Sequence, residues 1–234
     1  MLMDGFISDE SGSYGDIGSE QRSQTSGGHG VSGTAALKLY HGSDKVVQIA
    51  DIMLPGPRFT CDFGNGFYLA ESKRVAEEWV AREDTPVLNE YDFAAIKEDI
   101  LELTGEAWLR VVVGFRTGKY RVFLRSPVVR GIIANDRMDI SLPFFLRGEI
   151  GDQRLFRCLD FCKLGNQYLL RQSAKYLINH SYKLLKGSEL QQAEKRRVAR
   201  RRGMDTELQR IRRQPIPGEK YIDDYLAGGD FYEV

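Results

Sequence analysis

The sequence predicts a domain of the α+β class, and three observations support that prediction. Runs with strand character and amphipathic helical runs are mixed between residues 37 and 185, without the regular alternation typical of a doubly wound sheet. No internal repeat is visible along the chain. The composition, 42% apolar and 28% charged, is that of a globular protein. We therefore expect one mixed domain with a different segment at each end.

Local patterns assign the strands and helices of this domain. Ser72 is a suitable N-cap for the helix after the second strand, and Val75 and Val80 belong to an apolar face of that helix. Trp79 and Trp108 are expected in the core. The expected strands cover 37–41, 67–69, 86–93, 100–103, 128–134 and 167–170, and the expected helices cover 72–82, 106–115, 138–147, 152–162 and 173–178.

Residues 1–36 form the expected N-terminal tail. They are rich in Ser, Gly, Asp and Gln, and they carry five acidic residues and one arginine. Such a segment cannot bury enough apolar surface to offset the entropy lost on ordering, so we predict a disordered leader or linker. His29, which has a glycine on either side, is then a solvated tail residue.

A basic helix is expected over residues 189–213, with a break near Gly203. Residues 186–213 hold ten Lys or Arg against four Asp or Glu. One interpretation is a solvated, partly mobile C-terminal extension (residues 186–234). Another is a surface for nucleic acid or an acidic partner, since clustered arginines neutralise phosphates, and the helix could also fold back on the acidic tail. Aromatic residues are not interleaved with the cations, so stacking on single strands is not indicated.

The cysteines and histidines do not form the pattern of a metal site. Three of each are scattered without ligand spacing, so no metal is expected. Cys158 and Cys162 lie four residues apart in an apolar helical run and are expected to be core thiols, and an odd cysteine count fits a reducing compartment. Neither a signal peptide nor an apolar run of membrane-spanning length is visible. We expect a cytoplasmic protein, or one exported by a specialised secretion system.

Residues 39–79 carry the strongest functional signal. A strand ends in Leu-Tyr-His-Gly-Ser (39–43), and a Gly-rich turn (62–66) later leads into Phe-Tyr-Leu (67–69) and a helix. Glycines allow close backbone approach to a ligand, a tyrosine ring can stack on it, and an imidazole offers two hydrogen-bonding nitrogens. The pattern predicts a pocket for a flat, partly anionic ligand. The turn lacks the Lys and Ser/Thr of a P-loop, which argues against nucleotide hydrolysis by that route.

Five stretches, in order, resemble a bacterial family known only as domain of unknown function 3990. They extend over residues 38–185, nearly two thirds of the chain, and the ordered set is far more specific than any single stretch. That family looks like a branch of the ADP-ribosyltransferase fold, in which split antiparallel β-sheets are flanked by helices. The stretches are Leu39–Ser43, Asp62–Leu69 with Trp79, Asn89–Phe93, Ala134–Arg137, and Asn166–Tyr168 with Ala174 and Leu177.

The resemblance implies a site for NAD, as a substrate, between the two sheets. In the His-Tyr-Glu branch of that fold, the first-strand histidine hydrogen-bonds ribose hydroxyls, and here it would be His41. The next residue, Gly42, would hold the nicotinamide amide through its backbone, and Tyr68 would stack on the nicotinamide ring. The NAD-binding residues implied in this way are His41, Gly42, Ser43, Gly66, Phe67 and Tyr68.

The third position of that motif departs from the Glu pattern of the His-Tyr-Glu branch. The strand that carries a Glu in that branch begins with Gln167-Tyr168 in this sequence. A Glu fixes the nicotinamide ribose and stabilises the positive charge that develops as nicotinamide leaves, by the logic of glycoside hydrolysis. Gln167 can hydrogen-bond a ribose hydroxyl but carries no charge. Asp136, Glu90 or the substrate would then supply an anion. Asn135 and Asp136 are candidate auxiliary residues at a strand end, or simply an Asx turn.

The sequence thus predicts an NAD-dependent ADP-ribosyltransferase, with His41, Tyr68 and Gln167 as its catalytic residues. It would modify a macromolecule and release nicotinamide, in the manner of a toxin or secreted effector. Two alternatives stay open: a non-catalytic binding module on the same fold, which the glutamine favours, and an NAD glycohydrolase, in which water replaces the acceptor. Each residue also has a structural interpretation, as a strand-end histidine, a core tyrosine and a glutamine at a sheet edge.

Overall fold

A computed structural model describes residues 36–54, 61–134 and 141–234 of the chain. Ala35–Val234 makes up one compact unit. Three expectations fall outside the described residues: the disorder of the N-terminal tail, the position of His29 and the roles of Asn135 and Asp136. The described fold is mixed, with a mostly antiparallel sheet and several helices, which confirms the predicted α+β class.

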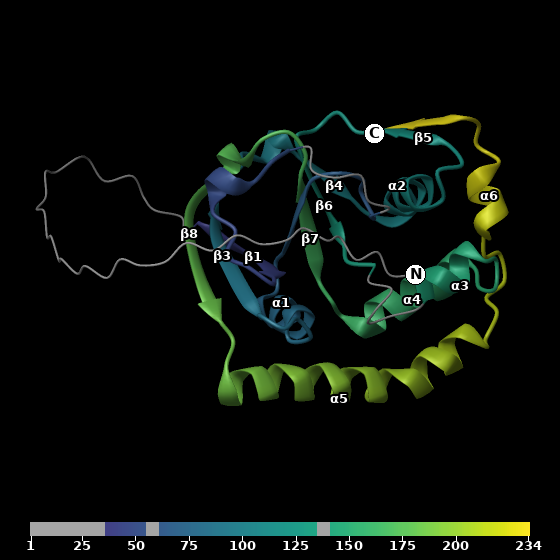
Figure 1. The fold of residues 1–234 in the computed structure, drawn as a ribbon. Helices are drawn as coiled ribbons and strands as arrows, with labels where there is room; N and C mark the ends of the chain where they lie inside the picture. Colours follow the sequence, from purple (N-terminus) through teal and green to yellow (C-terminus); the bar gives the residue numbers. More distant parts are fainter. Residues whose placement is uncertain (1–35, 55–60, 135–140) are drawn as a thin grey trace, which may run out of the picture. The chain divides into compact units, whose positions relative to one another are not determined.

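Figure 1 shows the elements along the chain. The strands are β1 (Leu37–Ser43), β2 (Phe67–Ala70), β3 (Val87–Phe93), β4 (Ile100–Leu103), β5 (Arg121–Phe123), β6 (Val128–Ile132), β7 (Asn166–Leu170), β8 (Leu177–Leu184) and β9 (Phe231–Glu233). The helices are α1 (Lys73–Val80), α2 (Gly105–Thr117), α3 (Ser141–Leu146), α4 (Asp152–Cys162), α5 (Gly187–Arg212) and α6 (Ile222–Leu226), with 3-10 helices at Ile49–Asp51, Lys97–Asp99 and Ala174–Tyr176. Most expected elements are present within a few residues of their expected bounds.

Seven of the described strands form one sheet, in the order β4-β6-β7-β2-β1-β3-β8, and β5 pairs with β9 apart from it. Neighbours in the large sheet are antiparallel except β4 and β6, which are parallel and are connected through α2. The contact between β1 and β2 is unusual, because among the described residues only Tyr40 and Ala70 pair there. By contrast, β1 pairs with β3 along its whole length. The sheet therefore consists of two halves that meet at one residue pair.

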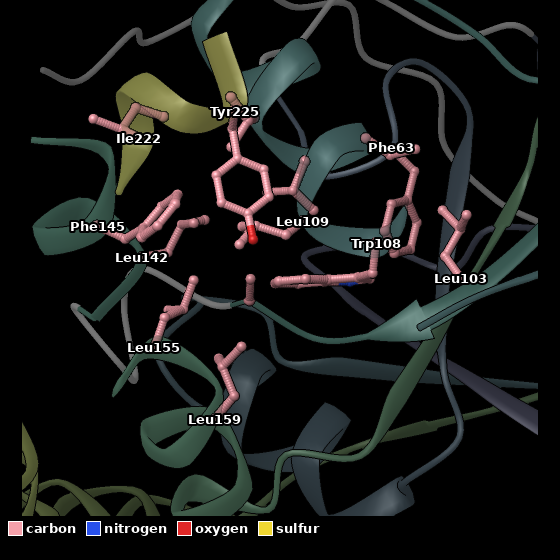
Figure 2. Packing of buried hydrophobic residues seen from close by; sticks show 14 of the residues in the cluster. Phe63, Leu103, Trp108, Leu109, Leu142, Phe145, Leu155, Leu159, Ile222 and Tyr225 are labelled. Carbon is pink, nitrogen blue, oxygen red and sulfur yellow. The ribbon is translucent and has the colours of Figure 1, made fainter. Parts of the chain in front are cut away.

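Each face of this sheet carries a buried hydrophobic core. One face packs against α2, α3, α4 and α6, and Figure 2 shows Tyr225 and Ile222 of α6 pointing into the same core as Trp108 of α2. The other face carries a smaller core that includes Leu39 and Tyr91, and residues 49–54 pack against it. The C-terminal residues thus help to form the main core of the unit.

Individual residues confirm and correct the expected core. Trp108 is fully buried, as are Cys158 and Cys162, so these three expectations are confirmed. Trp79 is only half-buried, and the Arg82 guanidinium lies 4.4 Å above its ring, so the expectation of a core residue was wrong. The buried face of α1 is formed by residues 75, 76, 78 and 80, which leaves this tryptophan at the margin.

The segment after β7 also differs from the expected one. We expected a helix over residues 173–178, but the structure has a 3-10 turn at Ala174–Tyr176 followed by β8, a strand that the sequence did not predict. Leu177 is buried, whereas most other residues of β8 are exposed, so the strand lacks the alternation that would have marked it. Its conformation depends on pairing with β3 at the edge of the sheet.

The basic helix α5 packs against α1 and α4 (Figure 1). Ala193 and Leu208 are buried in this contact, at 0% and 3% exposure. Arg200 donates to the Glu78 carboxylate at 2.7 Å, and Glu78 is itself fully buried. Arg196 adds a bond of 2.6 Å to Glu77. One face of α5 is therefore built into the unit.

The predicted break near Gly203 was wrong, because α5 is continuous from Gly187 to Arg212. Gly203 is exposed, and a Cβ at this position would meet no atom within 4 Å. An exposed helical glycine costs only about 1 kcal/mol relative to alanine, which the packing of α5 offsets. The glycine therefore marks no structural division in the helix.

We predict that Arg200→Ala lowers the free energy of unfolding by about 2 kcal/mol, because it removes a charged hydrogen-bond donor from the buried Glu78 carboxylate. The adjacent Arg201 is exposed and provides a matched control, for which we expect a change within about 0.5 kcal/mol. Urea unfolding of both variants measures the difference. Equal losses in the two variants would contradict the packing of α5 described here.

Candidate functional site

The site begins where β1 and β2 part. Beyond the pair of Tyr40 with Ala70, the His41–Ser43 end of β1 has no backbone partner among the described residues of β2. The His41 ring bridges the two strands here, because its Nδ1 lies 2.9 Å from the Tyr68 carbonyl oxygen. A carbonyl only accepts, so Nδ1 carries the proton and donates it. The imidazole thus joins the two halves where backbone pairing stops.

Burial sets the protonation state of this histidine. Desolvation lowers the pKa of His41 below its ordinary value, and the bond to the Tyr68 carbonyl opposes that shift only in part. The ring is therefore neutral at pH 7, with its one proton on Nδ1. Its Nε2 is then a hydrogen-bond acceptor, which can accept a hydrogen bond from a hydroxyl group.

Phe67 lies beside His41 on the same face of the sheet. The two ring centroids are 4.5 Å apart, and the far side of Phe67 meets the Tyr91 ring edge-on at 5.8 Å. Phe67 also belongs to the smaller core. The Phe67 ring therefore packs between the His41 and Tyr91 rings and limits how the imidazole can turn.

Gly42 is required by helix packing. A Cβ on Gly42 would lie 2.9 Å from both the Ala76 carbonyl oxygen and the Val80 Cβ atom of α1. Real side chains do not approach so closely, so α1 can rest on β1 only if this residue is glycine. The same contact brings α1 against the end of β1 that carries His41. The glycine in this motif therefore has a structural cause that is independent of any ligand.

Ser43 is held by a buried asparagine on β3. The Asn89 amide donates to the Ser43 hydroxyl at 3.1 Å and to the Lys45 carbonyl at 3.2 Å. Its oxygen accepts from the Val47 backbone N–H at 3.0 Å, and the His180 ring lies at the same distance. Asn89 is fully buried, so its four contacts fix the chain that follows β1. Asn89 begins one of the five stretches that resemble the family, but no local pattern in the sequence indicated this role.

Glu90 lies on the face of the sheet opposite to His41. Glu90 pairs with Tyr40 in the β1–β3 register, whereas His41 pairs with Asn89, and successive strand residues point to opposite faces. Glu90 forms an ion pair with Lys38 at 2.7 Å. By the same register Glu90 shares the face of Gln167, because Tyr40 pairs with both Glu90 and Ala70, and Ala70 pairs with Gln167. That Glu90 supplies the anion missing at position 167 stays a prediction, and the second candidate, Asp136, lies outside the described residues.

The Gly-rich turn before β2 holds the phenol of Tyr68. Its hydroxyl accepts from the Phe63 backbone N–H at 2.9 Å and donates to the Gly64 carbonyl at 2.8 Å. Burial raises the pKa of Tyr68 well above its usual value, so the phenol stays neutral. Gly66 allows the start of β2 to pack closely against β7, because a Cβ at this residue would lie 2.3 Å from the Leu170 carbonyl oxygen. The turn thereby fixes the plane of the Tyr68 ring.

A buried carboxylate in the same turn contacts Gln167. The Gln167 amide nitrogen lies 2.7 Å from Asp62 Oδ2, and Arg116 at the end of α2 donates to Asp62 Oδ1 from two nitrogens at 2.6 and 2.9 Å. Asp62 is 5% exposed. The turn therefore joins α2, β2 and β7. Sequence reasoning missed both Asp62 and Arg116, and only the position of Asp62 at the start of the Gly-rich turn offered a signal.

The structure brings the three predicted catalytic residues together in part. Tyr68 pairs with Leu169 and Ala70 pairs with Gln167, so Tyr68 and Gln167 share one face and are diagonal neighbours on adjacent strands. His41 belongs to the opposite face by register, but its ring reaches the Tyr68 backbone where the strands part. The three side chains therefore lie around the parting of β1 and β2, but not on one face of the sheet.

Two other features are absent from the described residues. These residues contain no group of three or more His, Cys, Asp or Glu that could hold a metal ion. In the same residues, no helix is long and apolar enough to cross a membrane. The site consists of organic hydrogen-bonding groups and aromatic rings, together with one carboxylate–guanidinium pair.

A family model described as "Protein of unknown function (DUF3990)" matches residues 37–179, which is more than half of the chain. The chain therefore belongs to this family. The matched range contains β1 to β7 and so includes His41, Tyr68 and Gln167. No curated protein and no solved structure matches the chain.

We predict that the free energy of unfolding falls as the pH drops below about 6.5, the pKa of an unfolded histidine. Burial lowers the pKa of both His41 and His180 in the folded protein, so the unfolded chain binds protons more readily in this range. The stability that neutral histidines contribute is complete above about pH 6.5 and is lost as the pH falls through their folded pKa values.

Urea unfolding at a series of pH values between about 7.5 and 5 measures this effect. Replacing both residues in a His41→Gln, His180→Gln variant should flatten the pH dependence in that window. A slope equal to that of the unmodified protein would show that other groups cause the loss. His29→Gln serves as the control for a histidine in the predicted tail.

Proposed function

We propose that this protein is an NAD-dependent ADP-ribosyltransferase whose NAD site lies between the two halves of the sheet. The observation that carries the proposal is the single pairing of β1 with β2, with His41 and Tyr68 at the point where these strands part. Such a parting is what the ADP-ribosyltransferase-like fold, with its split antiparallel sheets, requires. The ordered motifs over residues 38–185 add to this support.

NAD would bind through His41, Gly42, Tyr68 and Gln167. The His41 Nε2 would accept a hydrogen bond from a ribose hydroxyl, because the only ring proton is engaged at the Tyr68 carbonyl. The Gly42 backbone lies at the unpaired edge of β1 and would hold the nicotinamide amide. The Tyr68 ring, fixed by its two hydroxyl bonds, would stack on nicotinamide. Gln167 would hydrogen-bond the nicotinamide ribose.

The proposed reaction breaks the bond between ribose C1′ and the nicotinamide ring nitrogen. The electron pair of that bond goes to the ring nitrogen, so nicotinamide leaves as a neutral molecule and C1′ becomes electron-poor. A nucleophile of the acceptor then forms a bond to C1′ and releases its proton to water. Stacking on Tyr68 and hydrogen bonding by Gln167 hold the two parts of NAD in position while the bond breaks.

The acceptor is proposed to be a macromolecule, and α5 offers a surface for it. Arg196 and Arg200 are engaged with α1, but Lys195, Arg201 and Arg202 are exposed. These cations would attract nucleic acid or an acidic partner, although the exposed Glu194 and Asp205 on the same helix weaken that attraction. With water as the acceptor, the same site would be an NAD glycohydrolase. If the domain binds a partner but does not turn over NAD, it would be the non-catalytic binding module.

We predict that His41→Ala and Tyr68→Ala each abolish nicotinamide release from NAD. Tyr68→Phe should retain most of the turnover because it keeps the ring, while it loses about 1–3 kcal/mol of folding stability by leaving the Phe63 N–H and the Gly64 carbonyl without a partner. Chromatography of NAD and nicotinamide, together with urea unfolding, measures both effects. His29→Ala and Tyr182→Ala, an exposed tyrosine of β8, are the matched controls.

Labelled NAD separates the proposed function from its alternatives. Label on a macromolecule, lost in His41→Ala, is the expected result for a transferase. Nicotinamide release without label in a cell lysate would assign the glycohydrolase. Full turnover in both alanine variants would exclude the site described here, and absence of both turnover and NAD binding would favour the binding module.

A further inference from the structure

Asp62 lies against the one predicted catalytic residue that departs from the family branch. We propose that Asp62 is a positioning residue, which orients the Gln167 amide so that its carbonyl oxygen, rather than its nitrogen, is presented to the nicotinamide ribose. The inference rests on the proposed function and assigns the carboxylate a role in it. It also explains how a glutamine can occupy a position at which a glutamate would be expected.

The orientation of the Gln167 amide follows from its neighbours. Its nitrogen lies 2.7 Å from Asp62 Oδ2 and 3.5 Å from the Ile132 carbonyl oxygen. A carboxylate and a backbone carbonyl can only accept hydrogen bonds, so the atom facing them must be the NH2 group. The carbonyl oxygen of Gln167 is then directed away from Asp62. If the amide of Gln167 were turned around, its oxygen would face the Asp62 carboxylate and the Ile132 carbonyl, and neither of these can donate a hydrogen bond.

Arg116 fixes the Asp62 carboxylate, which in turn orients the Gln167 amide. Two of its nitrogens lie 2.6 and 2.9 Å from Asp62 Oδ1, which leaves Oδ2 for Gln167. The Ala134 backbone N–H approaches Oδ2 at 3.4 Å from the other side. Because Asp62 is 5% exposed, water competes little for these bonds. The carboxylate therefore has one orientation, and it gives one orientation to the amide.

The contact also changes the chemistry of Gln167. An amide that donates N–H to an anion is polarised, so its carbonyl oxygen becomes a stronger acceptor. That oxygen would receive a ribose hydroxyl proton and place partial negative charge near the electron-poor C1′. A glutamate at position 167 would instead lie about 3 Å from the Asp62 carboxylate, where like charge raises the pKa of one of the two groups. Asp62 and an ionised glutamate at position 167 therefore disfavour each other.

Exchanging the two functional groups tests this proposal. The proteins compared are the unmodified chain, Asp62→Asn, Gln167→Glu and the double variant Asp62→Asn, Gln167→Glu. Each is assayed for nicotinamide release from NAD, with kcat expressed per folded molecule, KM for NAD, and stability in urea. Asp160→Asn, at an exposed aspartate of α4, controls for loss of a carboxylate elsewhere.

Asp62→Asn should lower kcat at least about tenfold with little change in KM, since its amide would face Gln167 and turn the latter around. Gln167→Glu should gain an ionisation in its pH–rate profile that the unmodified protein lacks. The double variant should recover kcat to within about threefold, because an asparagine N–H then donates to a glutamate carboxylate. Recovery distinguishes positioning from a merely structural role, which would change stability without changing kcat per folded molecule.

Failure of the positioning role and failure of the proposed function give different results. An unchanged kcat in Asp62→Asn, together with loss of kcat in Gln167→Ala, would overturn the positioning role and leave the proposed function intact. Absence of NAD binding and of nicotinamide release in the unmodified protein would overturn the proposed function and this inference with it.

Discussion

The arrangement of the candidate site depends on one constraint, the interruption of backbone pairing between β1 and β2. Tyr40 and Ala70 pair, and the next residues of β1 do not pair with β2 in the described part of the chain. The His41 ring spans this parting by donating a hydrogen bond to the Tyr68 carbonyl, so a side chain joins the two halves where their backbone pairing has stopped. Packing of α1 on Gly42 from one face and of Phe67 on His41 from the other keeps the edge of β1 in place.

A second centre of the site is the Asp62 carboxylate, which connects the turn before β2 to β7 and α2. The turn that holds the Tyr68 hydroxyl also carries the carboxylate that contacts Gln167 on β7 and Arg116 on α2. A displacement of this turn would therefore move the tyrosine and the glutamine together. The aromatic ring and the amide therefore lie on one face of the sheet and share one support, the Gly-rich turn.

The sequence could predict the parts of this site that lie within one element. The strand ending at His41, the Gly-rich turn before Tyr68 and the strand of Gln167 each have a local signature. The Asp62–Arg116 and Asp62–Gln167 contacts join residues 54 and 105 positions apart, and no local pattern reports such pairs. β8 was missed because most of its residues are exposed and do not alternate with buried ones. Gly203 suggested a break that helix packing overrides.

A titration of the isotopically labelled protein with NAD, followed by nuclear magnetic resonance, tests the location of the site most directly. If NAD binds between the two halves of the sheet, the His41 ring signals and the backbone amides of Gly42 and Phe67 should shift on binding, while those of β5 and β9 should not. Shifts confined to α5, or none in this group at saturating NAD, would contradict an NAD site at the parting of β1 and β2.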